Sequence, residues 1–312
     1  MNKTKILRKK LDNYKNNPIL APGVHDPYCA RIAEKLGFDT LYMSGAATSM
    51  SRLGYADFGL ITATEMQTHA RYIASITKLP LMADSDTGYG NALNVMRTIQ
   101  DYISLGISGV HIEDQIWPKR CGHLKGKLVI PKEEMVEKIK AAKKIINEFD
   151  PNFILIARTD SRGVSGGNID KAIDRLTAYH IAGADVIFAD GLTSINELQK
   201  IHKSIEAPIL FHPTGLSPRL TLNDCANLGV GILLYPFASI HVMAVAVWNY
   251  FKELKNINTT AQINFEKQFN NHVLKDIKSL FDLGGLNELQ DIEKQFISKE
   301  QFDLRYKKSI GL

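Results

Sequence analysis

The 312-residue sequence is poor in cysteine and has no long apolar run. Its three cysteines, Cys29, Cys121 and Cys225, cannot form a disulfide framework, which favours a reducing, cytoplasmic setting. No apolar stretch approaches the ~20 residues that a membrane-spanning helix needs. The first fifteen residues are basic and polar, without the apolar core of a secretion signal. We therefore expect neither a membrane contact nor secretion.

The sequence also lacks a concentrated patch of one charge. It has 38 Lys and Arg against 33 Asp and Glu, a formal net charge of +5, with both signs interspersed. Nucleic-acid-binding proteins usually gather their basic residues on one face or segment, so no nucleic-acid partner is expected. A slight positive bias suits a small anionic substrate.

Eight short apolar runs recur with helical segments between them. The runs are almost continuously apolar, as parallel strands covered on both faces are; they lie near residues 19–21, 40–43, 80–83, 109–112, 153–157, 186–188, 209–211 and 231–234. The segments 132–148 and 169–182 show helical spacing of apolar residues. This alternation predicts an α/β fold, a (β/α)8 TIM barrel. A doubly wound sheet competes, but no Gly-x-Gly-x-x-Gly turn follows the first strand.

We assign residues 1–250 to a catalytic barrel and residues 251–312 to a C-terminal helical arm. The arm is polar, with Leu, Phe and Ile spaced among charges. It either caps the barrel with extra helices or packs on another subunit.

Carboxylates follow two neighbouring strands. In a barrel of this type the active site lies at the carboxyl ends of the strands, where Asp84, Asp86 and Glu113 are expected. Oxygen ligands of this kind favour Mg²⁺, or alternatively Mn²⁺, over zinc. Asp84 and Asp86 could instead serve as cap and turn residues.

Two further strand ends offer groups that bind carboxylates. Arg158 could hold one with two parallel hydrogen bonds, or could form an ion pair with Asp160 or Glu113. Ser44 and the backbone N–H groups of Gly45 and Ala46 would suit a second carboxylate, or form an ordinary strand-to-helix turn.

Cys121 stands between the basic pair Lys119-Arg120 and His123. Positive neighbours should favour its thiolate form, which marks the loop as a reaction centre. His123 either packs the loop or lowers the Cys121 pKa.

Three other residues are interpreted as structural. Cys29 and Cys225 have no evident charged partners and are expected to be packing residues. His111 lies inside the fourth expected strand and is also assigned to packing.

Taken together, these motifs resemble the isocitrate lyase / phosphoenolpyruvate mutase superfamily. The resemblance runs from about residue 5 to about residue 250. The motifs, in chain order, are Ser44-Gly45, Leu53-Gly54-Tyr55-Ala56-Asp57, Asp84-Ser85-Asp86-Thr87-Gly88-Tyr89-Gly90, His111-Ile112-Glu113-Asp114-Gln115, Lys119-Arg120-Cys121-Gly122-His123 and Ala157-Arg158-Thr159-Asp160.

The resemblance implies a barrel whose last helix swaps between subunits, giving a homo-oligomer, either a dimer or a tetramer. It implies that Asp84 is the principal metal contact, and it assigns the rest of the metal shell and the substrate contacts by position. The implied metal shell is completed by Asp57, Asp86 and Glu113, partly through water, and the implied substrate contacts include Ser44, Gly45, Ala46, Gly122 and Arg158. Cys121 would be the general acid/base on a mobile loop, with His123 beside it.

The cysteine loop resembles that of the carbon–carbon lyase branch. That branch cleaves 2-hydroxy di- or tricarboxylates, such as 2-methylisocitrate or 2-alkylmalates, by retro-aldol chemistry to an α-keto acid and a carboxylate. A carboxyphosphonoenolpyruvate phosphonomutase and an oxaloacetate hydrolase remain as alternatives. The non-enzyme alternative is an inactive barrel that serves as a scaffold.

Two positions depart from the lyase pattern. The branch usually has glutamate near position 190 and asparagine near position 212, whereas this chain has Asp190 and His212. By the resemblance, both contact the variable end of the substrate. The reaction class is therefore better specified than the substrate.

Overall fold

The strands of the chain form one parallel barrel. The computed structural model describes residues 2–307 and 310. The eight strands are hydrogen-bonded in the order β1-β8-β7-β6-β5-β4-β3-β2, and a single bridge between Gly23 and Tyr42 links β1 to β2. The strands are β1 (Ile19–Pro22), β2 (Leu41–Met43), β3 (Leu81–Asp84), β4 (Gly109–Glu113), β5 (Ile154–Thr159), β6 (Val186–Ala189), β7 (Ile209–Phe211) and β8 (Val230–Tyr235). The predicted (β/α)8 barrel is confirmed, with all eight strands where the apolar runs indicated.

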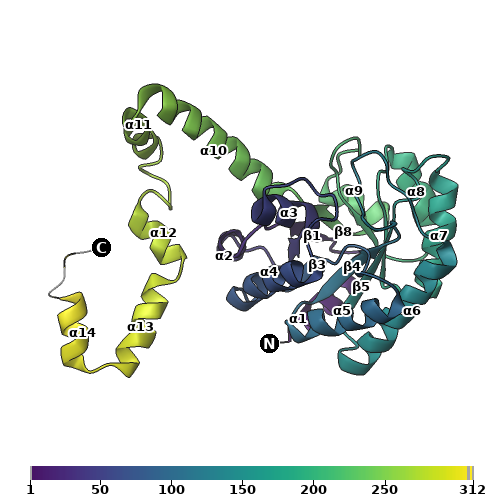
Figure 1. The fold of residues 1–312 in the computed structure, drawn as a ribbon, viewed down its shortest axis with the longest axis horizontal. Helices are drawn as coiled ribbons and strands as arrows, with labels where there is room; N and C mark the ends of the chain where they lie inside the picture. The colour runs from purple at the N-terminus through teal and green to yellow at the C-terminus, as the bar shows by residue number, and fades with distance from the viewer. Residues whose placement is uncertain (1, 308–309, 311–312) are drawn as a thin grey trace. The chain divides into compact units, whose positions relative to one another are not determined.

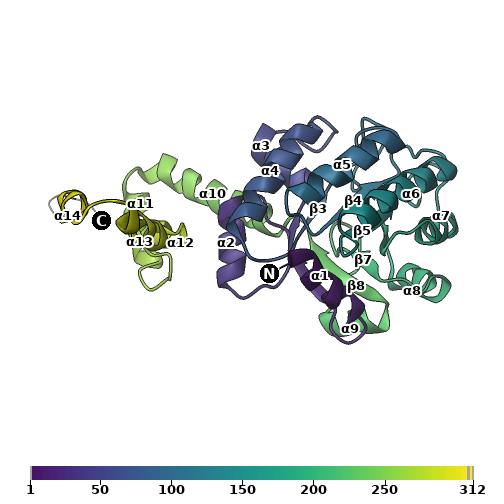
Figure 2. The same ribbon diagram turned by 90° about the horizontal axis from the view of Figure 1, so that it is seen from below.

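Helices surround these strands (Figures 1 and 2). They are α1 (Lys3–Asp12), α2 (Pro27–Lys35), α3 (Gly45–Leu53), α4 (Ala63–Ile76), α5 (Ala92–Ser104), α6 (Lys132–Phe149), α7 (Ile169–Ile181), α8 (Ile195–Ser204) and α9 (Leu222–Asn227). The two helices expected from their spacing, α6 and α7, agree with the prediction to within one residue at each end. In α6 the apolar positions Met135, Ile139, Ala142 and Ile146 are all buried, as one helical face requires.

The buried apolar residues form two clusters, one inside the ring of strands and one between the strands and the helices. The inner cluster contains alternate strand residues, for example Ile154 and Ile156 of β5, whereas Leu155 and Ala157 belong to the outer cluster beneath the helices. Leu7 and Leu11 of α1 join the inner cluster. Because strand side chains alternate with a period of two, the next inner position of β5 belongs to Arg158.

The same alternation places polar residues at the inner face of the other strands. Met82 of β3 is an inner residue, and Asp84 comes two residues later. Phe188 of β6 is an inner residue, and Asp190 comes two residues later. On β4, Val110 and Ile112 lie in the outer cluster. Strand geometry thus gathers these side chains at one end of the barrel.

The chain separates into two compact units, one ending at His241 and one beginning at Val242. The boundary falls inside α10 (Ala238–Ile257), whereas the sequence suggested residue 250. The second unit continues with α11 (Thr260–Gln268), α12 (Ile277–Leu283), α13 (Leu286–Phe296) and α14 (Lys299–Tyr306). Within the described residues, none of these helices, nor any in the barrel, is long and apolar enough to cross a membrane.

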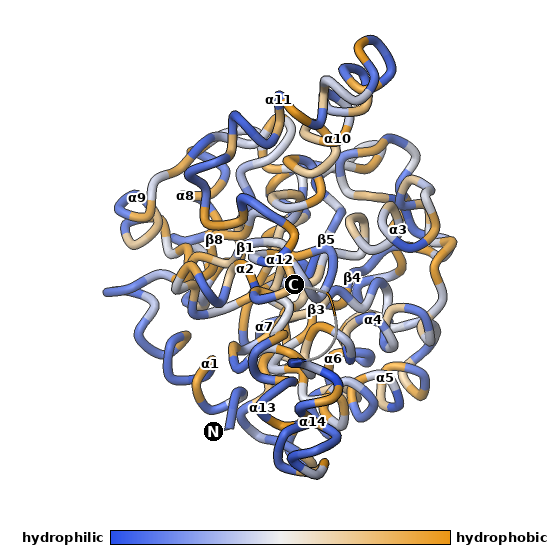
Figure 3. Tube along the Cα trace, turned by 90° about the vertical axis from the view of Figure 1, so that its left-hand side faces the viewer, coloured by the Kyte–Doolittle hydropathy of each residue, from blue (hydrophilic) through white to orange (hydrophobic). Residues whose placement is uncertain are grey.

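The second unit buries little of its own apolar surface. Trp248, Phe251 and Phe296 are exposed, and Ala261 is the one hydrophobic side chain counted as buried in its described part. Hydrophobic and hydrophilic residues alternate along its helices (Figure 3).

Candidate active site

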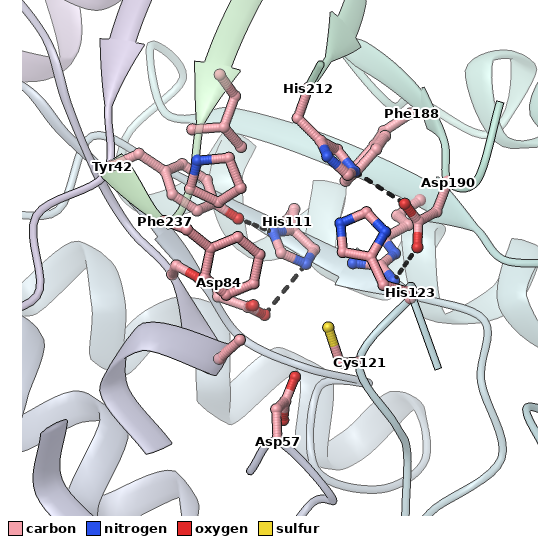
Figure 4. Close-up of a pocket in the computed structure, with 16 residues that line it drawn as sticks. Tyr42, Asp57, Asp84, His111, Cys121, His123, Phe188, Asp190, His212 and Phe237 are labelled. Carbon is pink, nitrogen blue, oxygen red and sulfur yellow. Dashed lines mark hydrogen bonds and ion pairs between the residues drawn. The ribbon is translucent and has the colours of Figure 1, made fainter. Parts of the chain in front are cut away.

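One cavity lies at the carboxyl ends of the strands (Figure 4). Asp84 and His111 stand on one side of Cys121, and His123, His212 and Asp190 on the other. The cavity has a volume of ≈ 40 Å³, room for about three water molecules. The predicted residues among its lining are Ser44, Ala46, Asp57, Asp84, Cys121, Gly122, His123, Arg158, Asp190 and His212.

On the first side of the cavity, Asp57 and Asp84 line it, whereas the predicted Asp86 and Glu113 are fully buried and do not. We name these four residues the acidic wall. Asp84 accepts hydrogen bonds from the backbone N–H of Gly45 (3.0 Å) and of Asp86 (2.9 Å). A β-carbon on Gly45 would fall 2.6 Å from Asp84 Oδ2. Glycine at position 45 therefore lets the chain approach this carboxylate.

His111 belongs to the acidic wall as well as to β4. Its Nε2 lies 3.1 Å from Asp84 Oδ1, and its Nδ1 lies 2.5 Å from the hydroxyl of Tyr42. Burial opposes ionisation of Asp84, but the charges of His111 and Lys119 outweigh it and lower the pKa of this carboxyl. His111 is buried between Tyr42 and Phe188, as a structural residue would be, but β4 also turns its ring into the cavity.

Lys119 was not among the expected site residues. Its Nζ lies 2.8 Å from Asp57 Oδ2 and 2.7 Å from Asp86 Oδ1, and its side chain is 2% exposed. Burial lowers the pKa of a lysine, yet the surrounding carboxylates raise that of Lys119 well above its usual range. Burial also raises the pKa of Asp86, to about 7, although Lys119 opposes the shift. The sequence offered no signal for this contact, because it joins the cysteine loop to two distant segments.

The acidic wall fits a hydrated divalent cation. Five of its buried carboxylate oxygens have no hydrogen-bond donor in suitable geometry: Asp57 Oδ1 and both oxygens of Asp86 and of Glu113. In the described part of the chain, no three ligand atoms of this wall lie mutually within 4.8 Å. Mg²⁺ usually keeps several waters, so the residues fit Mg²⁺ held partly through water.

Arg158 lies between the two sides of the cavity. Its guanidinium donates to both oxygens of Asp160, at 2.9 and 3.0 Å, and to Asp190 at 2.8 Å. Its Nε also lies 3.2 Å from Glu113 Oε2. Both ion pairs that the sequence left open, with Asp160 and with Glu113, are present. Asp160 orients the guanidinium, which lines the cavity.

The opposite side, which we name the histidine wall, consists of Asp190, His212, Thr214 and His123. His212 Nε2 lies 2.8 Å from Asp190 Oδ1, and His212 Nδ1 lies 2.5 Å from Thr214 Oγ1. The same hydroxyl lies 2.7 Å from His123 Nε2. Arg158, and the hydrogen bond from His212, hold the pKa of Asp190 well below its usual range despite burial. Thr214 was not anticipated, since nothing in the sequence joins the cysteine loop to this position.

The cysteine loop is fastened at both ends of the cavity. Besides Lys119, the buried Lys127 lies 3.0 Å from Asp160 Oδ1 and donates a hydrogen bond to the carbonyl of Gly122. A β-carbon on Gly122 would fall 1.3 Å from Asp190 Oδ2, so a side chain there is excluded in this arrangement. Lys127 is a second residue that the sequence did not indicate.

Cys121 is a thiol. Burial raises its pKa to about 11, although a hydrogen bond from the backbone N–H of His123 opposes the shift. The expectation that neighbouring positive charges stabilise a thiolate is therefore wrong, because Lys119 is neutralised by carboxylates and desolvation prevails. The imidazole of His123 contacts Thr214.

Ser44 caps α3, and its hydroxyl oxygen accepts a hydrogen bond from the backbone N–H of Ala47 at 3.4 Å. The strand-to-helix turn is thus present. Its residues Ser44 and Ala46 also line the cavity. A helix N-terminus favours an anion.

Comparisons with known proteins agree with the fold. The family model "Phosphoenolpyruvate phosphomutase" matches residues 7–255. The chain is 38% identical to 2,3-dimethylmalate lyase of Eubacterium barkeri, over 95% of this chain and 99% of that protein. It is 40% identical to 2-methylisocitrate lyase of Halalkalibacterium halodurans, over 76% and 78% of the two chains.

Two solved structures are also similar to this chain, in fold and in sequence. Oxaloacetate acetylhydrolase in complex with 3,3-difluorooxalacetate superposes with a TM-score of 0.84 at 34% identity, over 94% of this chain and 97% of that one. Phosphonopyruvate hydrolase in complex with oxalate and Mg²⁺ superposes with a TM-score of 0.83 at 29% identity, over 96% and 100%.

Proposed function

The chain belongs to the phosphoenolpyruvate phosphomutase family and is an enzyme related to carbon–carbon lyases; we propose that it cleaves a 2-hydroxy di- or tricarboxylate, such as a 2-alkylmalate or 2-methylisocitrate, to an α-keto acid and a carboxylate. The observation that carries this proposal is the position of the Cys121 thiol, which lines the cavity together with Asp57, Asp84 and Arg158. A proton donor at this position is what a carbanionic leaving group requires.

The acidic wall would hold Mg²⁺, with Mn²⁺ as the alternative cation. Asp84 is the proposed principal ligand, and Asp57, Asp86 and Glu113 complete the shell, partly through water. When bound, the cation supplies Lewis-acid stabilisation of negative charge on the substrate oxygens. The carboxylate oxygens of this wall that lack a hydrogen-bond donor in suitable geometry, and the Mg²⁺ named with the similar phosphonopyruvate hydrolase structure, support the assignment.

The keto-acid end of the substrate binds between α3 and β5. Ser44 and the backbone N–H groups of Gly45 and Ala46 lie at the positive end of the helix dipole. Arg158 pairs with the carboxylate from the other side, exchanging one of its present acidic partners for the substrate. Asp160 keeps the guanidinium oriented throughout.

Cys121 supplies the proton that completes the reaction. In the proposed retro-aldol cleavage, a carboxylate of the acidic wall takes the hydroxyl proton and the O–H electron pair becomes the second bond of the new carbonyl. The carbon–carbon bond breaks and leaves its electron pair on the carbon beside the departing carboxylate. The Cys121 S–H bond then breaks and its proton joins that carbon. Because the thiol pKa is raised, Cys121 is protonated at neutral pH and ready to donate. His123 assists by donating its backbone N–H to the sulfur.

The lysines of the loop exclude water while the carbanion exists. Lys119 attaches the loop to Asp57 and Asp86, and Lys127 attaches it to Asp160. Both contacts are with the barrel, so they break when the loop opens and re-form when it closes. Gly122 then lies directly over Asp190, at the variable end of the substrate.

A second function is favoured by the similarity to oxaloacetate acetylhydrolase. In that case the substrate would be oxaloacetate, and water would release oxalate and acetate. A phosphonomutase acting on carboxyphosphonoenolpyruvate is the remaining alternative from the sequence.

We also propose that the chain is a homo-oligomer, a dimer or a tetramer, in which the last helix of the barrel is exchanged between subunits. The support is the exposed apolar surface of the second unit, including Trp248 and Phe251. Exposed apolar surface of this kind marks an interface. Light scattering coupled to gel filtration measures the state directly, and a monomer would refute the proposal.

The test of the activity is a Mg²⁺-dependent assay for α-keto acid release. The panel contains 2-methylisocitrate, 2,3-dimethylmalate, other 2-alkylmalates, isocitrate and oxaloacetate, with oxalate measured in parallel. We expect keto-acid release from one alkylated hydroxy acid. Release of oxalate alone would replace the lyase by the hydrolase, and no release from the panel would favour the phosphonomutase.

A further inference from the structure

A second cluster of metal-binding side chains lies outside the cavity, where β1 leads into α2. Among the residues that the structure describes, it is the single group of three or more His, Cys, Asp or Glu whose ligand atoms all lie within 4.8 Å of one another: His25, Asp26 and Cys29. His25 Nε2 lies 3.5 Å from Asp26 Oδ2 and 4.0 Å from Cys29 Sγ. Cys29 packs against the core as expected, but the expectation that it has no charged partners is wrong, because Asp26 lies beside it.

Hydrogen bonding fixes the tautomer of His25. The hydroxyl of Ser239 donates its only hydrogen to the carbonyl of Gly23, at 2.8 Å. Ser239 Oγ must therefore accept from the backbone N–H of His25 (3.1 Å) and from its Nδ1 (2.8 Å). Nδ1 thus carries a hydrogen, and in the neutral imidazole Nε2 carries a lone pair and no hydrogen.

Two other electron donors lie close to that nitrogen: Asp26 Oδ2, at 3.5 Å, and Cys29 Sγ, which lies beside the ring. Asp26 Oδ1 accepts the backbone N–H of Cys29 at 2.7 Å, which leaves Oδ2 facing His25 Nε2. Two acceptors 3.5 Å apart repel unless a proton or a cation lies between them. His25 is 5% exposed, whereas the Asp26 side chain is 41% exposed, so an ion could enter from solvent and keep a water.

We propose that His25 Nε2, Asp26 Oδ2 and Cys29 Sγ bind a Zn²⁺-like transition-metal cation, with water as the fourth ligand. Zn–N and Zn–O bonds of about 2.1 Å and a Zn–S bond of about 2.3 Å place tetrahedral ligand atoms roughly 3.3 to 3.7 Å apart. The 3.5 Å between His25 Nε2 and Asp26 Oδ2 already lies in this range. Cys29 Sγ, at 4.0 Å from Nε2 and 3.5 Å from Nδ1, has to turn towards Nε2 to complete the site. Nitrogen and sulfur donors select Zn²⁺ or Co²⁺ over Mg²⁺.

The surrounding contacts hold two of the three ligands in place. Ser239 holds the far nitrogen of His25, and the backbone of Cys29 holds the far oxygen of Asp26. Hydrogen bonds of this kind orient metal ligands. Ser239 belongs to the first turn of α10, so the occupied site would also secure the start of that helix. The site shares no residue with the acidic wall.

Binding releases one proton. The Cys29 S–H bond breaks, the proton passes to solvent, and the sulfur electron pair forms the bond to the cation. Burial, with the nearby Asp26 charge, raises the pKa of Cys29 to about 12. The apparent affinity should therefore rise about tenfold per pH unit near neutrality.

The experiment is a titration of the full chain with Co²⁺ in the presence of excess Mg²⁺. We expect one Co²⁺ per chain, a near-ultraviolet thiolate-to-cobalt absorption band, and displacement of both by Zn²⁺. Cys29→Ala and His25→Asn should abolish the band; the asparagine amide can still donate to Ser239 but cannot replace Nε2. The matched controls Cys225→Ala, Cys121→Ala and Asp84→Asn should retain it.

The outcome that overturns the site is equally direct. Absence of the band in the unmodified chain would leave a protonated His25 paired with Asp26, with no metal site. A band that survives Cys29→Ala, or that disappears only in Cys121→Ala, would place the cation elsewhere. Cys29→Ser, with circular dichroism as the folding check, covers the case in which Cys29→Ala does not fold. Neither result depends on the proposed lyase activity.

Discussion

The two walls of the cavity both contain buried charged groups, but the two walls differ in how far these groups are hydrogen-bonded. In the acidic wall, both oxygens of Glu113 and of Asp86 lack suitable hydrogen-bond donors. In the histidine wall, Asp190 accepts from Arg158 and His212, and His212 is bonded at both ring nitrogens. Buried polar groups without partners are costly. The acidic wall is compensated only in part, by the ion pairs of Lys119 with Asp86 and of Arg158 with Glu113, whereas Asp190 and His212 of the histidine wall are hydrogen-bonded.

This difference suits the acidic wall to the bond-breaking step and the histidine wall to substrate discrimination. An incomplete set of oxygen ligands is suited to a metal and hence to the bond-breaking step. A complete network of charged groups is rigid, and it discriminates between substrates by the shape and hydrogen bonds that it presents. Four experiments test this assignment of roles to the two walls, from the largest expected effect to the smallest.

Removing the central carboxylate of the acidic wall should abolish its function. We expect Asp84→Ala to lose Mg²⁺ binding and at least about 10³-fold in turnover, equivalent to about 4 kcal/mol of transition-state stabilisation. Calorimetric titration with Mg²⁺ and the keto-acid assay measure the two effects. Asp174→Ala is the control, because this exposed aspartate forms an ion pair with Lys132 alone among the described residues. Unchanged Mg²⁺ affinity in Asp84→Ala would move the metal site elsewhere.

Cys121 lies between the walls and should affect catalysis without affecting metal binding. Cys121→Ala or Cys121→Ser should lower turnover by about 10² to 10⁴-fold, the usual contribution of a general acid. Mg²⁺-dependent binding of oxalate should persist, since the sulfur holds neither the cation nor the keto-acid end. Full activity in either variant would exclude the acid/base role.

The histidine wall should control substrate choice. The double substitution Asp190→Glu with His212→Asn, towards the usual lyase residues, should change the ratio of kcat/KM between two alkylated hydroxy acids by about 10 to 200-fold. Mg²⁺ affinity should be unaltered, in contrast with Asp84→Ala. The same ratio in the variant and the parent would mean that this wall does not contact the variable end of the substrate.

The protonation state of Cys121 can be measured by alkylation. In a Cys29→Ala, Cys225→Ala background, the rate with iodoacetamide should rise about tenfold per pH unit between roughly pH 7 and 10. It should level off near the pKa of about 11 that burial produces. The sign follows from desolvation, which favours the neutral thiol in the folded state. A rate that is already constant at pH 8 would indicate a thiolate and contradict the donor role.

Much of the barrel and its cavity could be predicted from the sequence. The strands are continuous apolar runs, and a period of two carries each inner face one step further, to Asp84, Arg158 and Asp190. The resemblance then supplied roles that the comparisons support at the level of the family. Substrate choice was not predictable, since it depends on how His212 and Thr214 are joined in space.

The errors have one physical origin. Lys119 was regarded as a charge beside Cys121, but the folded loop turns it towards Asp57 and Asp86. These carboxylates therefore neutralise the positive charge of Lys119, which was expected to stabilise a Cys121 thiolate. Cys29 was regarded as isolated because His25 and Asp26 were not considered as its neighbours, although a helix start brings them together.

The sequence by itself determined the order of the strands, the helical faces and the identity of the polar groups at the strand ends, because these depend on local periodicity. Only the tertiary structure decided which charges meet and which are desolvated. The state of Cys121 and the partners of Lys119 and Lys127 depend on a loop folding over the barrel. Burial and charge pairing are set by such long-range contacts, which no local pattern encodes.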